Sequence, residues 1–208
     1  MANQEKIKLF IDADDTILKS SEAVINILNE EYGIVPPKTY DDLRDWNYKS
    51  IYGGLSPTEC LKIYESEKFF TTLGIEKGFF ELFSPTLDIF EYYIVTKGTT
   101  FNLLKKQILF AEKFPEAHFI GIPMSDEDGE WNYSKASIDM RGGIQIDDRC
   151  DCLYGTNAAA KILYTHGRDF YWNRTKEYHI DNRYDCKDWN EITDVLMFFA
   201  KNREFLGA

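Results

Sequence analysis

The sequence predicts an α/β protein with a doubly wound parallel sheet and a small helical cap inserted after the first strand. Two observations predict this fold class. Short apolar segments alternate with segments of helical pattern, which is typical of parallel strands joined by crossover helices. The long stretch after the first apolar segment carries helical signals and no strand pattern. A chain of 208 residues can bury one sizeable core and a small accessory lobe.

Five segments are predicted as strands of this sheet. The first, Lys6–Ile11, is apolar and runs directly into a cluster of acidic residues. The others are Phe90–Val95, His118–Ile122, Gly143–Ile146 and Lys161–Tyr164. Ligands of open parallel sheets bind at the carboxyl ends of the strands, so polar residues that follow these segments are candidates for a site.

The helical cap is predicted to span residues 19–86. Ser21 can cap a helix that ends at Gly33, and Ser56 to Glu59 has the form of a capping box with proline at the first helical position. A similar box at Asp188 predicts a C-terminal helix. The predicted core consists of the remaining segments, residues 1–18 and 87–208.

The charge of the chain limits its partners. The formal net charge is −11 and the sequence pI is about 4.8, so nucleic acid polymers and anionic membranes would be repelled at long range. A small phosphorylated substrate remains compatible, because a divalent cation and a few lysines can supply positive charge inside a pocket. No stretch approaches the roughly 20 apolar residues of a membrane span.

Cysteine and histidine usage limits the class of metal site. The four cysteines form no C-x-x-C pair, and the three histidines are scattered without metal-ligand spacing. A zinc site of the usual kind is therefore not expected, and a hard, oxygen-bound metal is favoured. No apolar segment at the start of the sequence resembles a signal peptide, so a reducing cytoplasm is the expected location.

The acidic cluster after the first strand carries the candidate chemistry. Asp12 and Asp14 are spaced i, i+2 at a strand end, so they can converge on one site, with the small Ala13 between them. Hydrolysis of a phosphate ester needs a nucleophile and an acid that protonates the leaving oxygen. The two aspartates could fill these roles. Mg²⁺ could bind a carboxylate oxygen of Asp12 and the main-chain carbonyl of Asp14.

Three later segments supply the other groups that this chemistry needs. Asp147 and Asp148 follow a predicted strand and should lie at the same edge of the sheet. Thr96 ends another strand, and Lys97 leads into a helix whose N-terminus can receive phosphate oxygens. Lys135 is the remaining cation. Lys97 could instead only solvate the helix start, and Asp148 could cap the following helix.

The order of these groups resembles the four motifs of the haloacid dehalogenase superfamily, from residue 7 to about residue 150. The matching positions are Asp12, Asp14, Thr16, Thr96, Lys135, Asp147 and Asp148. The resemblance implies a phosphatase that uses magnesium. An aspartate at position 14 favours phosphoryl transfer over cleavage of a carbon–halogen bond, since haloacid dehalogenases themselves lack an acid there.

The resemblance also implies a role for each residue. Asp12 would be the nucleophile, and Asp14 the general acid and base. Thr96 and Lys135 would contact phosphate. Lys97 is a further candidate for this contact from its place before the helix rather than from the resemblance. Magnesium would be bound by Asp12, Asp14 and Asp147, and the supporting residues would be Thr16 and Asp148.

A narrower resemblance is to the 5′(3′)-deoxyribonucleotidases. It lies in the string Ile146–Arg149, in the helical insertion, and in a short C-terminal helix with Trp189 and Glu191. These enzymes dephosphorylate deoxynucleoside monophosphates, which would be the substrates here. That family has glycine where this chain has Asp15, a change that leaves the catalytic pair intact but alters the local turn.

The predicted cap contains three aromatic residues that could stack on a nucleobase, namely Trp46, Phe69 and Phe70. Packing inside the cap is the alternative for each of them. Two other functions also stay open: a phosphatase or phosphomutase for sugar phosphates, and a catalytically silent protein that binds a nucleotide or a partner. Retention of both Asp12 and Asp14 favours an enzyme. The sequence does not decide whether the chain forms a homodimer.

Overall fold

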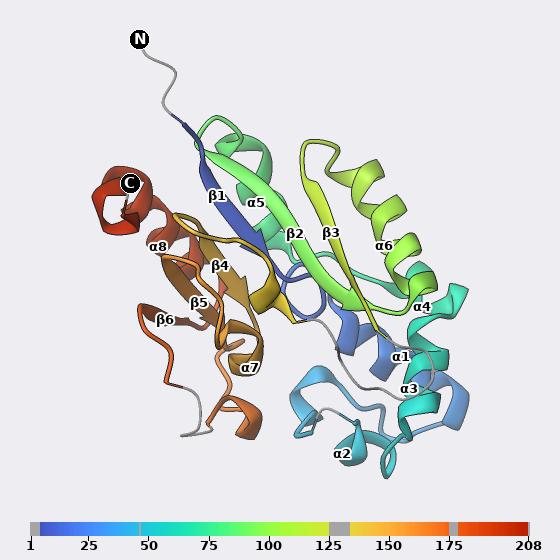
Figure 1. Cartoon of the computed structure of the whole chain (residues 1–208). Coiled ribbons are helices and arrows are strands. Elements are labelled where there is room, and N and C mark those ends of the chain that lie inside the picture. The colour runs from blue at the N-terminus through green and yellow to red at the C-terminus, as the bar shows by residue number, and fades with distance from the viewer. Residues whose placement is uncertain (1–4, 46, 125–133, 175–178, 208) are drawn as a thin grey trace.

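The computed structural model describes residues 5–45, 47–124, 134–174 and 179–207. Six strands form one parallel sheet in the order β3-β2-β1-β4-β5-β6 (Figure 1). Their bounds are β1 Ile7–Ile11, β2 Phe90–Gly98, β3 His118–Pro123, β4 Ile144–Asp147, β5 Ala160–Tyr164 and β6 Arg183–Cys186. The predicted parallel α/β fold is confirmed. β1 lies between β2 and β4 in this order, so its carboxyl end is close to the ends of both.

β6 is a strand that the sequence analysis did not predict. It runs Arg-Tyr-Asp-Cys and pairs only with β5, at the edge of the sheet. Only Cys186 of its four residues is buried. Edge strands are often short and charged, which limits unwanted pairing. The hydrophobic pattern that identified the other strands therefore gave no signal here.

Within the described residues the helices are α1 Ser20–Tyr32, α2 Lys49–Tyr52, α3 Pro57–Tyr64, α4 Glu67–Thr72, α5 Lys77–Phe83, α6 Thr100–Lys113, α7 Cys150–Leu153 and α8 Trp189–Lys201. Three of the helix signals predicted from the sequence are confirmed at α1, α3 and α8. The Ser56–Glu59 capping box is present at α3, and Asp188 caps α8. Gly33 ends α1 in the left-handed conformation. The prediction that Ser21 caps α1 is wrong: Ser21 lies inside the helix, and its N–H donates to the Asp15 carboxylate.

Helices cover both faces of the sheet. On one face α5, α6 and α8 share a cluster of aromatic side chains, in which the Phe79 ring lies 5.0 Å from Phe114 and 5.4 Å from Trp189. Gly78 is required at this packing, because a Cβ there would overlap with the Trp189 side chain. On the opposite face the short α7 packs against β4 and β5 through Leu153.

The inserted segment has an apolar cluster of its own. Its buried members come from α1, α2, α4 and the connecting loops, between Ala23 and Phe69. The two chain segments that join it to the sheet lie side by side, since the Lys19 N–H donates to the Gly74 carbonyl at 2.9 Å and the Glu76 N–H to the Ile17 carbonyl at 2.7 Å. α5 lies within the predicted cap range 19–86, but its side chains pack with the sheet. The predicted boundaries of the cap stay a prediction. Because α5 packs with the core, we use the term cap below for residues 19–73.

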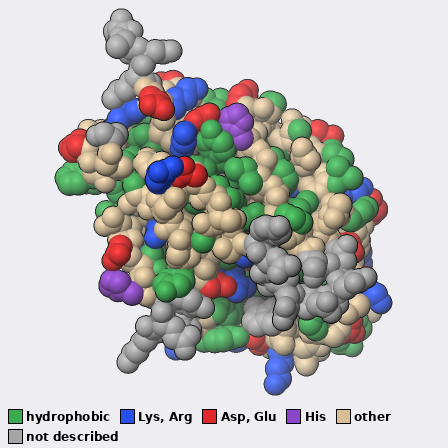
Figure 2. All heavy atoms as spheres, in the orientation of Figure 1, with side chains coloured by type: hydrophobic (Ala, Val, Ile, Leu, Met, Phe, Trp, Pro, Cys, Tyr) green, Lys and Arg blue, Asp and Glu red, His purple; other side chains and the backbone are tan. Residues whose placement is uncertain are grey.

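The surface carries both signs of charge. On the face shown in Figure 2, acidic and basic side chains are interspersed. Among the helices of the described ranges, none combines the length and the apolar character that crossing a bilayer requires.

Candidate active site

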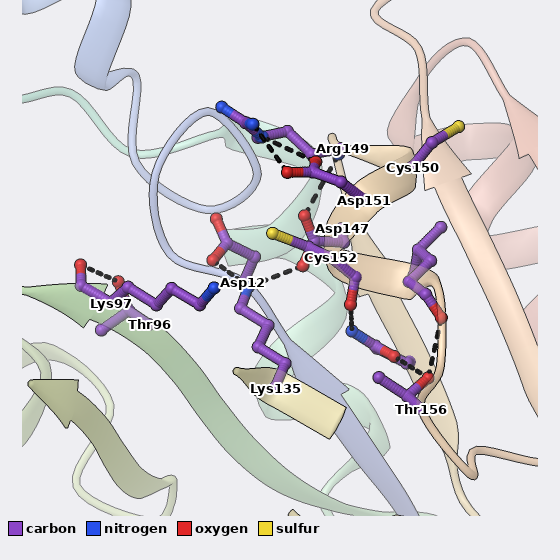
Figure 3. A network of polar contacts seen from close by, with 12 residues as sticks. Asp12, Thr96, Lys97, Lys135, Asp147, Arg149, Cys150, Asp151, Cys152 and Thr156 are labelled. Carbon is purple, nitrogen blue, oxygen red and sulfur yellow. Dashed lines mark hydrogen bonds and ion pairs between the residues drawn. The ribbon is translucent and has the colours of Figure 1, made fainter. Parts of the chain in front are cut away.

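Asp12 lies directly after β1, in the middle of the sheet. Its N–H donates to the Ile146 carbonyl of β4 at 2.9 Å, which holds the ends of these two strands together. Asp147 ends β4. Lys135, from a short 3-10 helix (Lys135–Ser137), contacts both carboxylates: its ammonium forms an ion pair with Asp12 and lies 2.6 Å from Asp147 Oδ2 (Figure 3). The structure therefore brings together three residues that the sequence predicted as one site.

The electrostatics of this cluster favour an additional cation. Burial and the neighbouring carboxylates raise the pKa of Asp12 to about 7, although Lys135 acts in the opposite direction. Burial alone would lower the pKa of Lys135, but Asp12 and Asp147 raise it well above its usual range. Burial and the same two carboxylates also raise the pKa of Asp148 well above its ordinary value. Three acidic groups around one ammonium leave excess negative charge, which a divalent cation would neutralise.

The donor set of the cluster suits magnesium. Asp12, Asp147 and Asp148 each offer a carboxylate oxygen, and these oxygens all lie within 4.8 Å of one another. Mg²⁺ prefers oxygen ligands and commonly binds through one or two carboxylates. Asp148, which the sequence predicts as a supporting residue, is one of these three grouped carboxylates. The carboxylate of Asp14 is not part of this group, and a contribution from its main-chain carbonyl stays a prediction.

The Asp14 carboxylate is held by Ser20 and Lys106, on the side of the site next to β2. Its Oδ1 accepts a hydrogen bond from Ser20 Oγ at 2.6 Å, and its Oδ2 forms an ion pair with the ammonium of Lys106 on α6. Lys106 also donates to Thr96 Oγ1 at 3.2 Å. The sequence analysis missed Lys106. A signal that could have revealed it is its spacing four residues before the apolar Phe110, which places both on one helical face.

The turn after Asp14 accommodates Asp15 where the deoxyribonucleotidases have glycine. Asp15 adopts the left-handed conformation with φ of 51°, which aspartate tolerates better than most residues. Its carboxylate accepts from Ser21 N at 2.7 Å and from Ser21 Oγ at 2.5 Å, so it caps α1. The Nε2–H of His166 donates to the Asp15 carbonyl at 2.6 Å. Burial raises the pKa of Asp15 to about 6.

The remaining predicted contacts lie around the same strand ends. Thr96 is fully buried, and its hydroxyl lies between Lys106 and the Lys97 carbonyl. The Lys97 side chain extends toward Asp12 in Figure 3 and borders the cavity described below. Thr16 is buried as well: its carbonyl accepts from Trp189 Nε1 at 3.2 Å, and its hydroxyl has no partner among the described residues.

A cavity of about 970 Å³ lies between these strand ends and the cap. The core residues that line it include Asp12, Asp14, Lys97, Lys135, Asp147, Asp148, Arg149, Asp151, Cys152 and Trp172. The cap residues include Ser21, Tyr40, Leu43, Tyr48, Pro57, Thr58, Cys60, Leu61, Tyr64 and Glu65. Charged groups therefore lie along the core side, and aromatic and apolar groups along much of the cap side.

The aromatic residues proposed to contact a base lie elsewhere or outside the described residues. Phe69 is completely buried in the apolar cluster of the cap, and the Phe70 ring lies 5.2 Å from it. Neither is among the described residues that line the cavity. Their position matches the alternative of packing inside the cap. Trp46 lies outside the described residues.

Solved structures with a similar fold include proteins described as haloacid dehalogenase-like hydrolases and as phosphatases. A haloacid dehalogenase-like hydrolase from Streptococcus pneumoniae is 17% identical, with a TM-score of 0.57 over 94% of this chain and 100% of its own. A phosphatase from Clostridium acetobutylicum, itself assigned by prediction, has a TM-score of 0.56 at 17% identity over the same shares. YfnB from Bacillus subtilis, assigned as a hydrolase by prediction and solved with bound magnesium, has a TM-score of 0.54 at 19% identity, over 93% of this chain and 99% of its own.

The chain has the haloacid dehalogenase-like fold. No family model matches the chain, and no curated protein matches its sequence. At the identities found, the likeness establishes the fold and leaves the activity to be argued from the site itself.

Proposed function

We propose that this chain is a magnesium-dependent phosphatase for small phosphate monoesters, with Asp12 as the nucleophile. The observation that carries the proposal is the Asp12 cluster: one carboxylate at the end of the central strand, in contact with Lys135 and grouped with Asp147 and Asp148. The haloacid dehalogenase-like fold supports it, because solved structures with this fold include proteins assigned as phosphatases by prediction.

In the proposed reaction a carboxylate oxygen of Asp12 attacks the phosphorus atom, and the bond to the leaving oxygen breaks. Asp14 gives a proton to that oxygen and then takes one from the water that hydrolyses the aspartyl phosphate. Lys135 and Lys97, which border the cavity, balance the charge of the phosphoryl oxygens. Magnesium, held by Asp12, Asp147 and Asp148, would contribute further positive charge next to the phosphoryl group.

The substrate we propose is a deoxynucleoside monophosphate. A cavity of about 970 Å³ is large enough for such a molecule. Tyr40, Tyr64 and Trp172 line it and are partly exposed, and aromatic rings can stack on a base or pack against a sugar. These three residues replace Phe69 and Phe70 as the candidates for contact with the leaving group.

The test is a phosphate-release screen over deoxynucleotides, ribonucleotides and sugar phosphates, with and without magnesium. We expect release that depends on magnesium, is highest with deoxynucleotides and is absent in Asp12→Asn. Release that continues in Asp12→Asn would refute Asp12 as the nucleophile. Highest turnover with sugar phosphates would refute the nucleotide assignment, and nucleotide binding without release would favour a silent binding protein.

A further inference from the structure

Lys106 is a buried cation that the proposed reaction does not yet use. It lies in the middle of α6, and only 1% of the residue is exposed. Its ammonium forms an ion pair with Asp14 Oδ2 and donates to Thr96 Oγ1 at 3.2 Å. One side chain thus connects α6 to the end of β2 and to the loop that follows β1.

Lys106 reaches the site through Asp14 and Thr96 rather than through the cavity. Asp14 borders the cavity, whereas Lys106 is not among the described residues that line it. Any effect of Lys106 on the reaction must therefore be transmitted through Asp14 or Thr96. Lys135 differs in this respect, because it lines the cavity itself.

Stability alone is a weak explanation for this ion pair. Removing an ammonium from water is costly, and replacing both members of a buried ion pair by apolar side chains of similar volume is often neutral or stabilising. α6 contributes apolar side chains such as Phe110 to the core on the same face, so an apolar residue at position 106 would be compatible with the packing. The placement of a lysine next to the proposed acid suggests a role in the site.

The two oxygens of Asp14 are held from two different elements. Ser20, at the start of α1, donates to Oδ1 at 2.6 Å, and Lys106 contacts Oδ2. Two anchors define the plane of a carboxylate, whereas one anchor leaves it free to rotate about χ2. We propose that Lys106 is a positioning residue that, together with Ser20, fixes the orientation of the Asp14 carboxyl group, whose protonated form gives its proton to the leaving oxygen. This inference rests on the proposed function.

The leaving group of the substrate provides a readout specific to this role. An alkyl phosphate releases a strongly basic oxygen that needs an acid, whereas p-nitrophenyl phosphate releases a weakly basic one that needs little help. We expect Lys106→Met to lower kcat/KM for propyl phosphate on the order of 100-fold, within the range of general acid catalysis, and for p-nitrophenyl phosphate less than about 10-fold. Equal losses on both substrates would overturn the proposal.

Two further variants separate positioning from a general structural effect. Lys105→Met removes the neighbouring lysine of α6, which forms a surface ion pair with Glu67, and should leave both substrates unaffected. In an Asp14→Asn background, Lys106→Met should cause no further loss, because its only proposed route of action is already removed. A full additional loss in that background would contradict the proposal. If Lys106→Met does not fold, Lys106→Gln is measured in the same way.

A crystal structure of the Lys106 variant tests the inference independently of activity. We expect the Asp14 carboxylate to be rotated away from its place beside Ser20 or to occupy more than one orientation. An unchanged, singly ordered Asp14 would overturn the positioning role whatever the activity. If the wild-type chain hydrolyses neither these esters nor any phosphate monoester of the screen, the proposed function fails, and this structural result still decides whether Lys106 positions Asp14.

Discussion

Two buried lysines lie on opposite sides of the central strand, and they differ in what they can do. Lys135 and Lys106 are 2% and 1% exposed, and each bridges the end of β1 to a neighbouring strand. Lys135 contacts Asp12 and Asp147 and lines the cavity, whereas Lys106 contacts Asp14 and Thr96 from behind it. The comparison teaches that burial and charge alone do not define the role of a lysine. Its role depends on which carboxylate it contacts and on whether it lines the cavity.

The largest expected effect comes from the carboxylate that Lys135 contacts. Asp12→Asn keeps the shape of the side chain but removes the attacking oxygen anion, so we expect kcat to fall by at least about 10⁴-fold. The measurement is steady-state release of phosphate from p-nitrophenyl phosphate. The unfolding transition of the same variant shows whether it is folded. Activity close to wild type in a folded Asp12→Asn would show that Asp12 is not the nucleophile, and contact with Asp12 would then give Lys135 no role in the reaction.

Lys135→Met sharpens the comparison with Lys106. Because Lys135 faces the phosphoryl group itself, its loss should affect alkyl and aryl esters alike, by about 10²- to 10³-fold in kcat/KM. The same two substrates proposed for Lys106 are used, so the two variants are compared directly. A loss confined to the alkyl ester would assign Lys135 the role proposed for Lys106, and the distinction would not hold.

Asp148 tests whether the acidic side of the site binds the metal. Asp148→Asn removes one of the three grouped carboxylates. We expect the magnesium concentration for half-maximal activity to rise by about 10-fold or more. Asp139→Asn is the matched control, because Asp139 forms an exposed ion pair with Arg141. An identical magnesium requirement in both variants would exclude Asp148 as a ligand.

His166 is a third side chain near the site that can carry positive charge, and its hydrogen-bond partner differs from those of Lys135 and Lys106. It has a carbonyl partner rather than a carboxylate, and burial lowers its pKa to about 4. Between pH 6.5 and 4 the unfolded chain therefore binds a proton that the folded chain does not, so the free energy of unfolding decreases as the pH falls through this range. The contribution of His166 is on the order of 2 kcal/mol.

The measurement is urea unfolding of the wild type and of His166→Gln at several pH values. The variant should lose this part of the pH dependence, whereas His118→Gln, at an exposed position, should keep it. Parallel pH profiles for the wild type and His166→Gln would show that the lowered pKa is not linked to folding.

Much of the candidate site could be predicted because its residues follow apolar strand patterns. Asp12 directly follows β1, Thr96 lies near the carboxyl end of β2, and Asp147 ends β4. The hydrophobic pattern predicts all three strands, and parallel strands end at one edge. The helix caps Ser56 and Asp188 could also be predicted from the sequence, because a helix cap is a local interaction within three residues. β6 was missed because a charged edge strand carries no apolar pattern.

The sequence by itself determined the sheet, the inserted helical segment and the order of the acidic groups, because these depend on local hydrophobic periodicity. Only the tertiary structure decided that Lys106 is buried while its neighbour Lys105 pairs with Glu67 at the surface. It also decided that tyrosines of the cap, rather than Phe69, face the cavity. The physical reason is that burial and contact across elements depend on which faces pack together, and adjacent residues of identical type carry no local signal of that choice.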